Sequence, residues 1–195
     1  MSRELEFFFD VGSPASYLAW TQAPGLCRRT GATLRYRPML LGGVFKATGN
    51  ASPAAVPAKG RYSGRDMQRF ARRYGVTLTM NPHFPVNTLM AMRLVTAALD
   101  SEQRDTVLAA LFEGLWLRER DLSDIDVLGQ TLTEAGLDAA HWAALAQEQT
   151  VKDNLKATTE EAVERGVFGA PTFFVGEEMF FGQDRLDFVE EALQT

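Results

Sequence analysis

Few residues of this 195-residue chain could perform chemistry, and their types exclude several kinds of site. Cys27 is the only cysteine, so the chain can form neither an internal disulfide nor a CxxC redox pair, and thiolate zinc sites are excluded. His83 and His141 are the only histidines and lie far apart in the sequence, which argues against a histidine-rich metal site. We therefore expect no metal, and the strongest candidate is the short polar loop at residues 10–16, DVGSPAS.

Ser13 lies where this loop meets an expected helix. Serine is a preferred N-cap, and Pro14 occupies the first helical position that proline favours. A helix N-terminus carries free N–H groups and the positive end of the helix dipole, so together with the Ser13 hydroxyl it suits a thiolate that a ligand brings. Ser-Pro pairs are common at helix starts, and on this pair alone a capping role is the simpler interpretation.

The elements around the loop predict an α/β fold. Residues 5–10 form a short aromatic run typical of a buried strand, the helix after Ser13 should end at Gly31, and residues 33–38 alternate like a second strand. Strand, helix and strand in this order indicate a parallel βαβ unit with a right-handed crossover. Ligands of such sheets gather at the carboxyl ends of the strands, which is where the loop lies.

The rest of the chain predicts a helical block followed by a return to the sheet. Residues 39–59 have the glycines and prolines of a loop, and Asp184 should cap a last helix. Without the block the element order is β-α-β-α-β-β-α, that of a thioredoxin-like domain. We therefore predict a thioredoxin-like domain at residues 1–40 and 151–195 with an all-helical domain inserted at 41–150. The expected helices are residues 61–73, 87–99, 107–117, 124–135, 139–147 and 151–165. The expected strands of the closing hairpin are residues 172–175 and 179–181.

Pro171 precedes the first strand of that hairpin, in the segment GVFGAPTFFV at residues 166–175. Proline cannot lie within a strand ladder, so it marks a strand start. In a thioredoxin-like fold this is the cis-proline loop, which faces the helix N-terminus and exposes backbone groups that can pair with a peptide-like ligand. We therefore expect a cis Ala170–Pro171 bond opposite Ser13.

At this point the chain resembles the 2-hydroxychromene-2-carboxylate isomerase family, relatives of the kappa-class glutathione transferases within the DsbA-like superfamily. Each motif is weak alone, but the ordered set is specific and spans nearly the whole chain. The segments that carry the resemblance are FFFDVGSPASYLA (7–19), LGGVFKATGN (41–50), PAKGRY (57–62), NPHFPVNT (81–88), Met92-Arg93, residues 166–175 and FGQDR (181–185).

The resemblance implies a glutathione site. In that family the serine that matches Ser13 holds the sulfur of glutathione, and backbone at Ala170, beside Pro171, pairs with the cysteinyl unit. A zwitterionic tripeptide needs an acid for its amine and cations or N–H groups for its carboxylates. The resemblance implies that Asn50, Lys59 and Tyr62 lie in a loop and helix that close over the ligand. It also implies that the turn with Gln183, Asp184 and Arg185 meets the γ-glutamyl end of glutathione.

The implied activity is a glutathione-dependent isomerisation of 2-hydroxychromene-2-carboxylate and trans-o-hydroxybenzylidenepyruvate, in aromatic catabolism. Reversible addition of a thiolate would let the double bond rotate, so glutathione would act as a cofactor and no protein nucleophile would be needed. Two alternatives stay open: a kappa-class-like transferase or peroxidase that consumes glutathione, and a non-catalytic thioredoxin-like binding module.

Partners and location follow from composition and from the same resemblance. The net charge of −5 argues against nucleic-acid binding, and neither an apolar run long enough to span a membrane nor a signal peptide is apparent. We therefore expect a cytoplasmic protein with a small aromatic carboxylate substrate, and the family tends to form homodimers.

Other residues have two interpretations each. Arg61, Arg65, Arg69 and Arg72 or Arg73 form a helical stripe that could attract an anionic substrate or could be a solvated face paired with Asp66. His83 could line the substrate pocket or act as an acid–base group, although a lone histidine without a visible partner is more often structural. Cys27 should be a buried small hydrophobe. Aromatic residues that could face a substrate but more often belong to a core are Phe45, Phe84 and Trp116.

Overall fold

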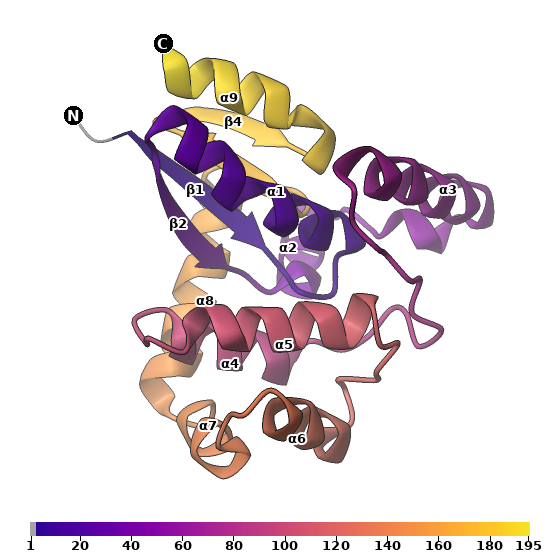
Figure 1. Ribbon diagram of the computed structural model, residues 1–195, viewed down its shortest axis with the longest axis vertical. Coiled ribbons are helices and arrows are strands. Elements are labelled where there is room, and N and C mark those ends of the chain that lie inside the picture. Colours follow the sequence, from indigo (N-terminus) through magenta and orange to yellow (C-terminus); the bar gives the residue numbers. More distant parts are fainter. Residues whose placement is uncertain (1–2) are drawn as a thin grey trace.

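A four-stranded mixed sheet lies at the centre of the computed structural model, which describes residues 3–195 (Figure 1). The strand order is β2-β1-β3-β4. β1 pairs with β2 in parallel and with β3 antiparallel, and β3 pairs with β4 antiparallel. The expected parallel βαβ unit and closing hairpin are therefore confirmed. The strands are β1 (Glu4–Phe9), β2 (Thr33–Pro38), β3 (Thr172–Val175) and β4 (Glu178–Phe181).

Three helices complete the thioredoxin-like part. α1 (Pro14–Thr30) follows β1, α8 (Gln149–Glu164) precedes β3, and α9 (Leu186–Gln194) ends the chain. Alternate side chains of β1 divide between the two faces of the sheet: Phe7 and Phe9 join the core on the side of α1 and α9, and Phe8 joins the cluster on the side of α8. The element order expected for a thioredoxin-like fold is thus confirmed.

The remaining helices lie between β2 and α8 in the chain, and in Figure 1 helices α4 to α7 gather beneath the ends of β1 and β2, with α3 to the side. One prediction here was wrong, because residues 39–59 are not a loop. They contain α2, the short helix η1 and the start of α3. The bounds are α2 (Leu41–Thr48), η1 (Pro53–Ala55), α3 (Pro57–Tyr74), α4 (Leu89–Ala98), α5 (Arg104–Trp116), α6 (Ile125–Glu134) and α7 (Ala139–Leu145).

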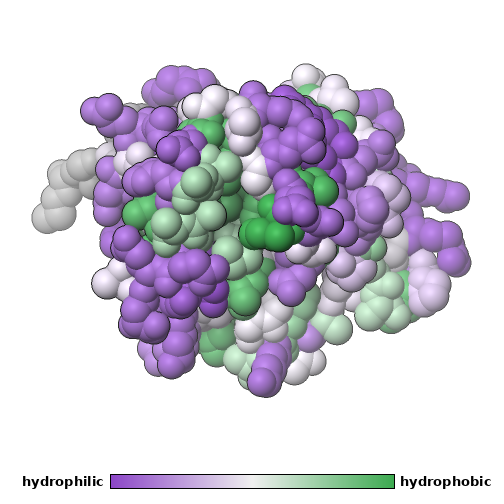
Figure 2. Space-filling model, turned by 90° about the horizontal axis from the view of Figure 1, so that it is seen from below, coloured by the Kyte–Doolittle hydropathy of each residue, from purple (hydrophilic) through white to green (hydrophobic). Residues whose placement is uncertain are grey.

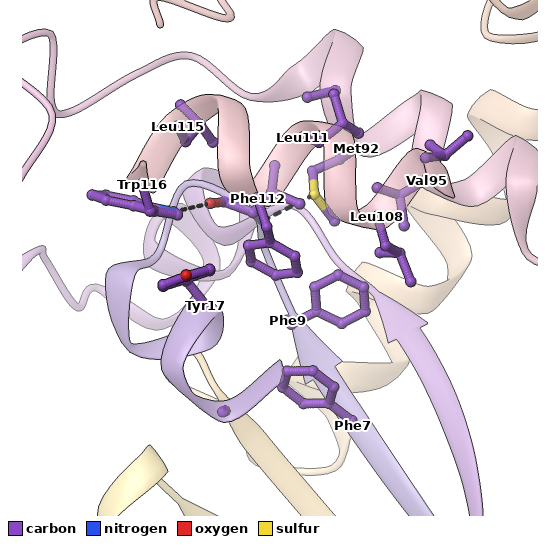
Figure 3. Close-up of a cluster of buried hydrophobic side chains, with 14 of the residues drawn as sticks. Phe7, Phe9, Tyr17, Met92, Val95, Leu108, Leu111, Phe112, Leu115 and Trp116 are labelled. Carbon is purple, nitrogen blue, oxygen red and sulfur yellow. Dashed lines mark hydrogen bonds between the residues drawn. The ribbon is translucent and has the colours of Figure 1, made fainter. Parts of the chain in front are cut away.

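The largest buried cluster runs without a break from the sheet into these helices. The Phe7 and Phe9 rings stack at 4.8 Å, and Phe9 stacks on Phe112 of α5 at 5.8 Å (Figure 3). Because stacked aromatic rings bury large apolar areas, this contact fixes the helices beneath the end of β1. The inserted helices are therefore packed directly against the strand that leads into the Ser13 loop.

A second correction concerns the last turn. Asp184 does not cap α9, because it lies inside a short 3₁₀ helix, η2 (Gln183–Arg185), and α9 begins at Leu186. Gly182 precedes η2 with a φ of 108°, a backbone conformation open to glycine. The side chain of Asp184 turns back to this glycine, and the residue at the N-cap of α9 is Arg185.

The surface beneath the inserted helices is mixed in character. Figure 2 views the molecule from that end and shows hydrophobic residues interspersed with hydrophilic ones. Among residues 3–195, no helix is long and apolar enough to cross a membrane. The expectation of no signal peptide rests partly on residues 1 and 2, which lie outside the described residues.

Candidate functional site

The first turn of α1 forms the centre of the candidate site. Ser13 is its N-cap, with extended backbone and a side-chain oxygen that accepts a hydrogen bond from the Ser16 N–H at 3.1 Å. Pro14 has no N–H to offer, and the Ala15 N–H has no carbonyl one turn earlier within the helix. The predicted cap and the predicted helix end at Gly31, which has a left-handed φ of 70°, are both confirmed.

The cis-proline loop faces this helix end as expected. The Ala170–Pro171 bond is cis, and the Ser13 hydroxyl donates a hydrogen bond to the Ala170 carbonyl at 3.1 Å. Ser13 is only 5% exposed, whereas Ala170 is half-buried. Two segments more than 150 residues apart thus meet at a single hydroxyl, which has the helix N–H groups on one side and the loop backbone on the other.

The turn before α9 joins the same site through backbone contacts. The Gly182 N–H donates to the Pro171 carbonyl at 3.0 Å, so Gln183, Asp184 and Arg185 begin directly beside the cis-proline. Gln183 is buried, and its carbonyl accepts a hydrogen bond from the Tyr74 hydroxyl of α3 at 2.7 Å. The structure therefore brings together Ser13, Ala170, Pro171 and the η2 residues.

A polar hollow of about 100 Å³ extends from η2 along α1. It contains both signs of charge, and its Arg29 forms a 2.7 Å ion pair with Glu190 of α9. Ser13 is not part of its lining, so the hollow adjoins the η2 end of the site and not the first turn of α1. Lining residues include Gln22, Arg29, Arg73, Tyr74, Gln183 and Asp184.

The closing loop and helix are only partly joined to the site. The Asn50 side-chain N–H donates to the Phe168 carbonyl at 2.8 Å, which places Asn50 two residues from Ala170 along the loop. Lys59 and Tyr62 lie exposed on α3, and Tyr62 has Arg69 over its ring at 5.9 Å. Asn50 thus contacts the candidate site. Among the described residues, Lys59 and Tyr62 form no hydrogen bond or ion pair with Ser13 or the cis-proline loop, and their role toward a ligand stays a prediction.

Asp10 is a residue of this site that the sequence analysis did not single out. It is 2% exposed, and its two carboxylate oxygens accept hydrogen bonds from the N–H groups of Gly12 and Leu41, each at 2.9 Å. Burial raises the pKa of Asp10, while hydrogen bonds from Leu41, Gly12 and the Thr88 side chain lower it. The available signal was its place at the carboxyl end of a buried strand, where ligands and their supports collect.

The residues with two interpretations are resolved in part. Cys27 is buried as expected, and burial raises the pKa of its thiol to about 11. Trp116 belongs to the core, with Phe84 packed against it at 6.0 Å. His83 is exposed, and its Nδ1 lies 3.8 Å from the Asp121 carboxylate. Burial thus agrees with a core role for Cys27 and Trp116, while a role of His83 or Phe84 toward a substrate stays a prediction.

The arginine stripe on α3 is exposed throughout. Arg69 pairs with Asp66 at 3.1 Å, as the solvated interpretation expects, and Arg73 lies over the Phe70 ring at 5.5 Å. Phe45 is half-buried on α2. The described contacts thus favour a solvated face for Arg69, and they leave the role of the other arginines as a prediction.

Comparison with known proteins decides the family. The model of the DsbA-like thioredoxin domain matches residues 4–194. This chain belongs to the DsbA-like thioredoxin family. Its fold is the thioredoxin-like fold of the family, and with Cys27 as its one cysteine the chain carries no dithiol.

Relatives with two named activities match nearly the whole chain. The chain is 33% identical to a 2-hydroxychromene-2-carboxylate isomerase of Sphingobium xenophagum, covering 99% of each chain. It is 31% identical to glutathione S-transferase kappa 1 of Rattus norvegicus, covering 98% of this chain and 91% of the relative. A solved 2-hydroxychromene-2-carboxylate isomerase superposes with a TM-score of 0.86 at 28% identity, over 97% of this chain and 94% of that one. The relatives are enzymes, and the chain is an enzyme of this isomerase and transferase group.

Proposed function

We propose that this DsbA-like protein is a glutathione-dependent isomerase that interconverts 2-hydroxychromene-2-carboxylate and trans-o-hydroxybenzylidenepyruvate. The observation that carries the proposal is the Ser13 hydroxyl, held at the N-terminus of α1 and 3.1 Å from the Ala170 carbonyl. No protein thiol is near, because Cys27 lies in the second half of α1. The similarity to named isomerases over the full chain supports the same reaction.

The residues present suit glutathione by the chemistry of their donors. Ser13 and the Ala15 N–H would hold the sulfur, and the cis-proline loop would pair with the cysteinyl backbone. At η2 the Asp184 carboxylate would meet the α-amine, while Arg185 offers a cation for a carboxylate. Arg185 lies 3.5 Å from Asp184 and both are partly exposed, so the pair can exchange partners at little cost.

Glutathione, when bound, would supply a thiolate that adds reversibly to the conjugated double bond, leaves a single bond free to rotate, and departs unchanged. The protein's part is to keep that sulfur ionised. Ser13 would turn its hydroxyl from the Ala170 carbonyl to the sulfur, and the first turn of α1 would add its dipole. Because the Ser13 oxygen already accepts from Ser16, its one proton is directed outward, to a ligand or to Ala170.

A second candidate is a transferase or peroxidase of the kappa type, which the 31% identity to the rat kappa-class enzyme favours. The same Ser13 site would ionise glutathione, but the thiol would be consumed. The two functions share a cofactor site and differ in the fate of the sulfur, so they make opposite predictions about thiol balance. The aromatic carboxylate remains our proposed substrate class for the isomerase.

Three measurements test and separate these proposals. Calorimetry with glutathione tests the shared site, and binding by wild type with loss of affinity in the Ser13→Ala variant supports it. Turnover of 2-hydroxychromene-2-carboxylate with a constant thiol count identifies an isomerase. Thiol loss with a chlorinated nitroaromatic or a hydroperoxide, without chromene turnover, identifies the transferase. Absence of glutathione binding overturns both and leaves a thioredoxin-like binding module.

A further inference from the structure

Both polar backbone groups of Val11 are bound by side chains from the inserted helices. The Val11 N–H donates to the Met92 sulfur of α4 at 3.3 Å, and the Trp116 indole N–H of α5 donates to the Val11 carbonyl at 2.8 Å (Figure 3). Val11 lies between β1 and α1, so neither the sheet nor the helix supplies partners. Met92 and Trp116 are buried, and both reach this loop from residues far along the chain.

The residues on either side of Val11 are held from the same direction. Asp10 accepts from the first N–H of α2, at Leu41, as well as from Gly12. At Gly12 there is no room for a side chain, since a Cβ would lie 2.7 Å from the Thr88 methyl group at the start of α4. The segment before Ser13 is therefore fastened to α2, α4 and α5, in addition to its own strand.

We propose that Trp116 and Met92 are positioning residues that aim Ser13 and the N-terminus of α1 at the bound thiolate, an inference that rests on the proposed function. Ser13 is two residues from Val11, and its N–H is tied to the Asp10 carbonyl at 3.0 Å. A buried peptide group that loses its partner must move or take in water. Freeing either group of Val11 would therefore turn the first residues of α1, with the hydroxyl and free N–H groups that they carry.

The chain supplies a matched control for Trp116. Trp142 of α7 is equally buried, but its indole N–H has no hydrogen-bond partner in the described part of the chain. Trp116→Phe and Trp142→Phe thus remove the same atoms from the core, and only the first removes a hydrogen bond to the Ser13 loop. A similar pair is Met92→Leu, which removes the sulfur acceptor, and Met39→Leu, at a buried methionine of the other core cluster.

The first readout needs no ligand. Hydrogen exchange of the backbone amides of residues 11–13, 15 and 16 in the free protein should become about tenfold faster in Trp116→Phe, the factor expected for one lost hydrogen bond. In Met92→Leu the same acceleration is expected at the Val11 amide. Trp142→Phe and Met39→Leu should leave these amides unchanged. Equal exchange at residues 11–16 in Trp116→Phe and Trp142→Phe would overturn the inference.

The second readout uses glutathione. Trp116→Phe should raise the apparent pKa of the bound thiol by about half a unit or more and lower kcat about tenfold with little change in KM, since misplaced catalytic groups cost turnover before binding. Trp142→Phe should retain the wild-type thiol pKa, and a merely structural loss at Trp116 would lower the melting temperature without moving that pKa. If the wild-type protein fails to bind glutathione, the proposed function is wrong. The exchange experiment still tests whether Trp116 and Met92 hold the Val11 backbone.

Discussion

Replacing Ser13 by alanine removes one oxygen that makes two hydrogen bonds. The hydroxyl accepts from the Ser16 N–H and donates to the Ala170 carbonyl, both at 3.1 Å. Loss of the first bond removes the N-cap of α1, which costs about 0.5–2 kcal/mol of stability. The half-buried Ala170 carbonyl can take a water molecule instead. We therefore expect a folded variant with a modestly lower melting temperature.

The effect on a bound thiolate is the difference between two hydrogen bonds. When the Ser13 hydroxyl turns to the sulfur, it loses a neutral hydrogen bond to Ala170, worth about 1 kcal/mol, and gains a hydrogen bond to an anion, worth about 1.5–3 kcal/mol. The gain of roughly 0.5–2 kcal/mol corresponds to a rise of roughly 0.4–1.5 units in the thiol pKa when Ser13 is removed. In the transition state, loss of such a donor costs about 2–4 kcal/mol, so turnover should fall roughly 30- to 1000-fold.

Thiolate absorbance against pH, in the glutathione complex, measures this directly. Free thiols titrate near 8.5 and the bound thiol should titrate at least about one unit lower, as cysteines at helix N-termini do. Ser16→Ala is the matched control, because the Ser16 hydroxyl is buried without a partner in residues 3–195 and lies one turn along the same helix. A bound thiol that titrates like free glutathione, or a Ser13→Ala complex that titrates like wild type, would refute this role for Ser13.

Three further outcomes follow from the same residues. Cys27, with its pKa raised by burial to about 11, should react with a thiol reagent at pH 8 only after denaturation; rapid labelling of native protein would contradict the burial. Gly182→Ala should lower the melting temperature by several degrees, because φ is 108° and a Cβ would lie 2.4 Å from the Asp184 carboxylate; an unchanged midpoint would show that the turn can relax. Burial raises the pKa of Asp10 above 3.8, so its ionisation lowers the free energy of unfolding of the wild type as the pH rises from 3.8 through the raised pKa. In urea denaturation, Asp10→Asn should therefore be destabilised relative to wild type by more near pH 3.5 than at pH 7. An equal difference at both pH values would place the pKa of Asp10 at its ordinary value.

The elements that sequence predicts well are those with local causes. Ser13, Pro14 and Gly31 mark the two ends of α1 through capping chemistry that involves neighbouring residues only, and the structure has each in its expected place. The closing hairpin also has a local cause, because the glycine turn at Gly176, with a φ of 60°, separates two short apolar strands. Such signals need no knowledge of distant contacts.

Helix α2 was missed because its causes are distant. It begins after Leu40 without a side-chain cap and contains Gly42 and Gly43, which weaken a helix. Its first N–H groups are bound by other elements: Leu40 donates to the Thr159 hydroxyl of α8, and Leu41 donates to Asp10. Tertiary partners therefore override local propensity here, and periodicity could not reveal them.

The candidate site divides along the same line. Ser13 and Pro171 were recognisable from the chain, because a capped helix start and a proline before a strand are local patterns. The roles of Asp10, Met92 and Trp116 beside Ser13 were not, since their hydrogen-bond partners are visible only after folding. The Trp116 indole donates to a carbonyl 105 residues earlier in the chain. A site without a thiol of its own contributes only the direction of a hydroxyl and a few N–H groups, so the groups that hold this direction are part of its chemistry. That is a physical reason for the inserted helices to pack against Val11, and not only against the sheet.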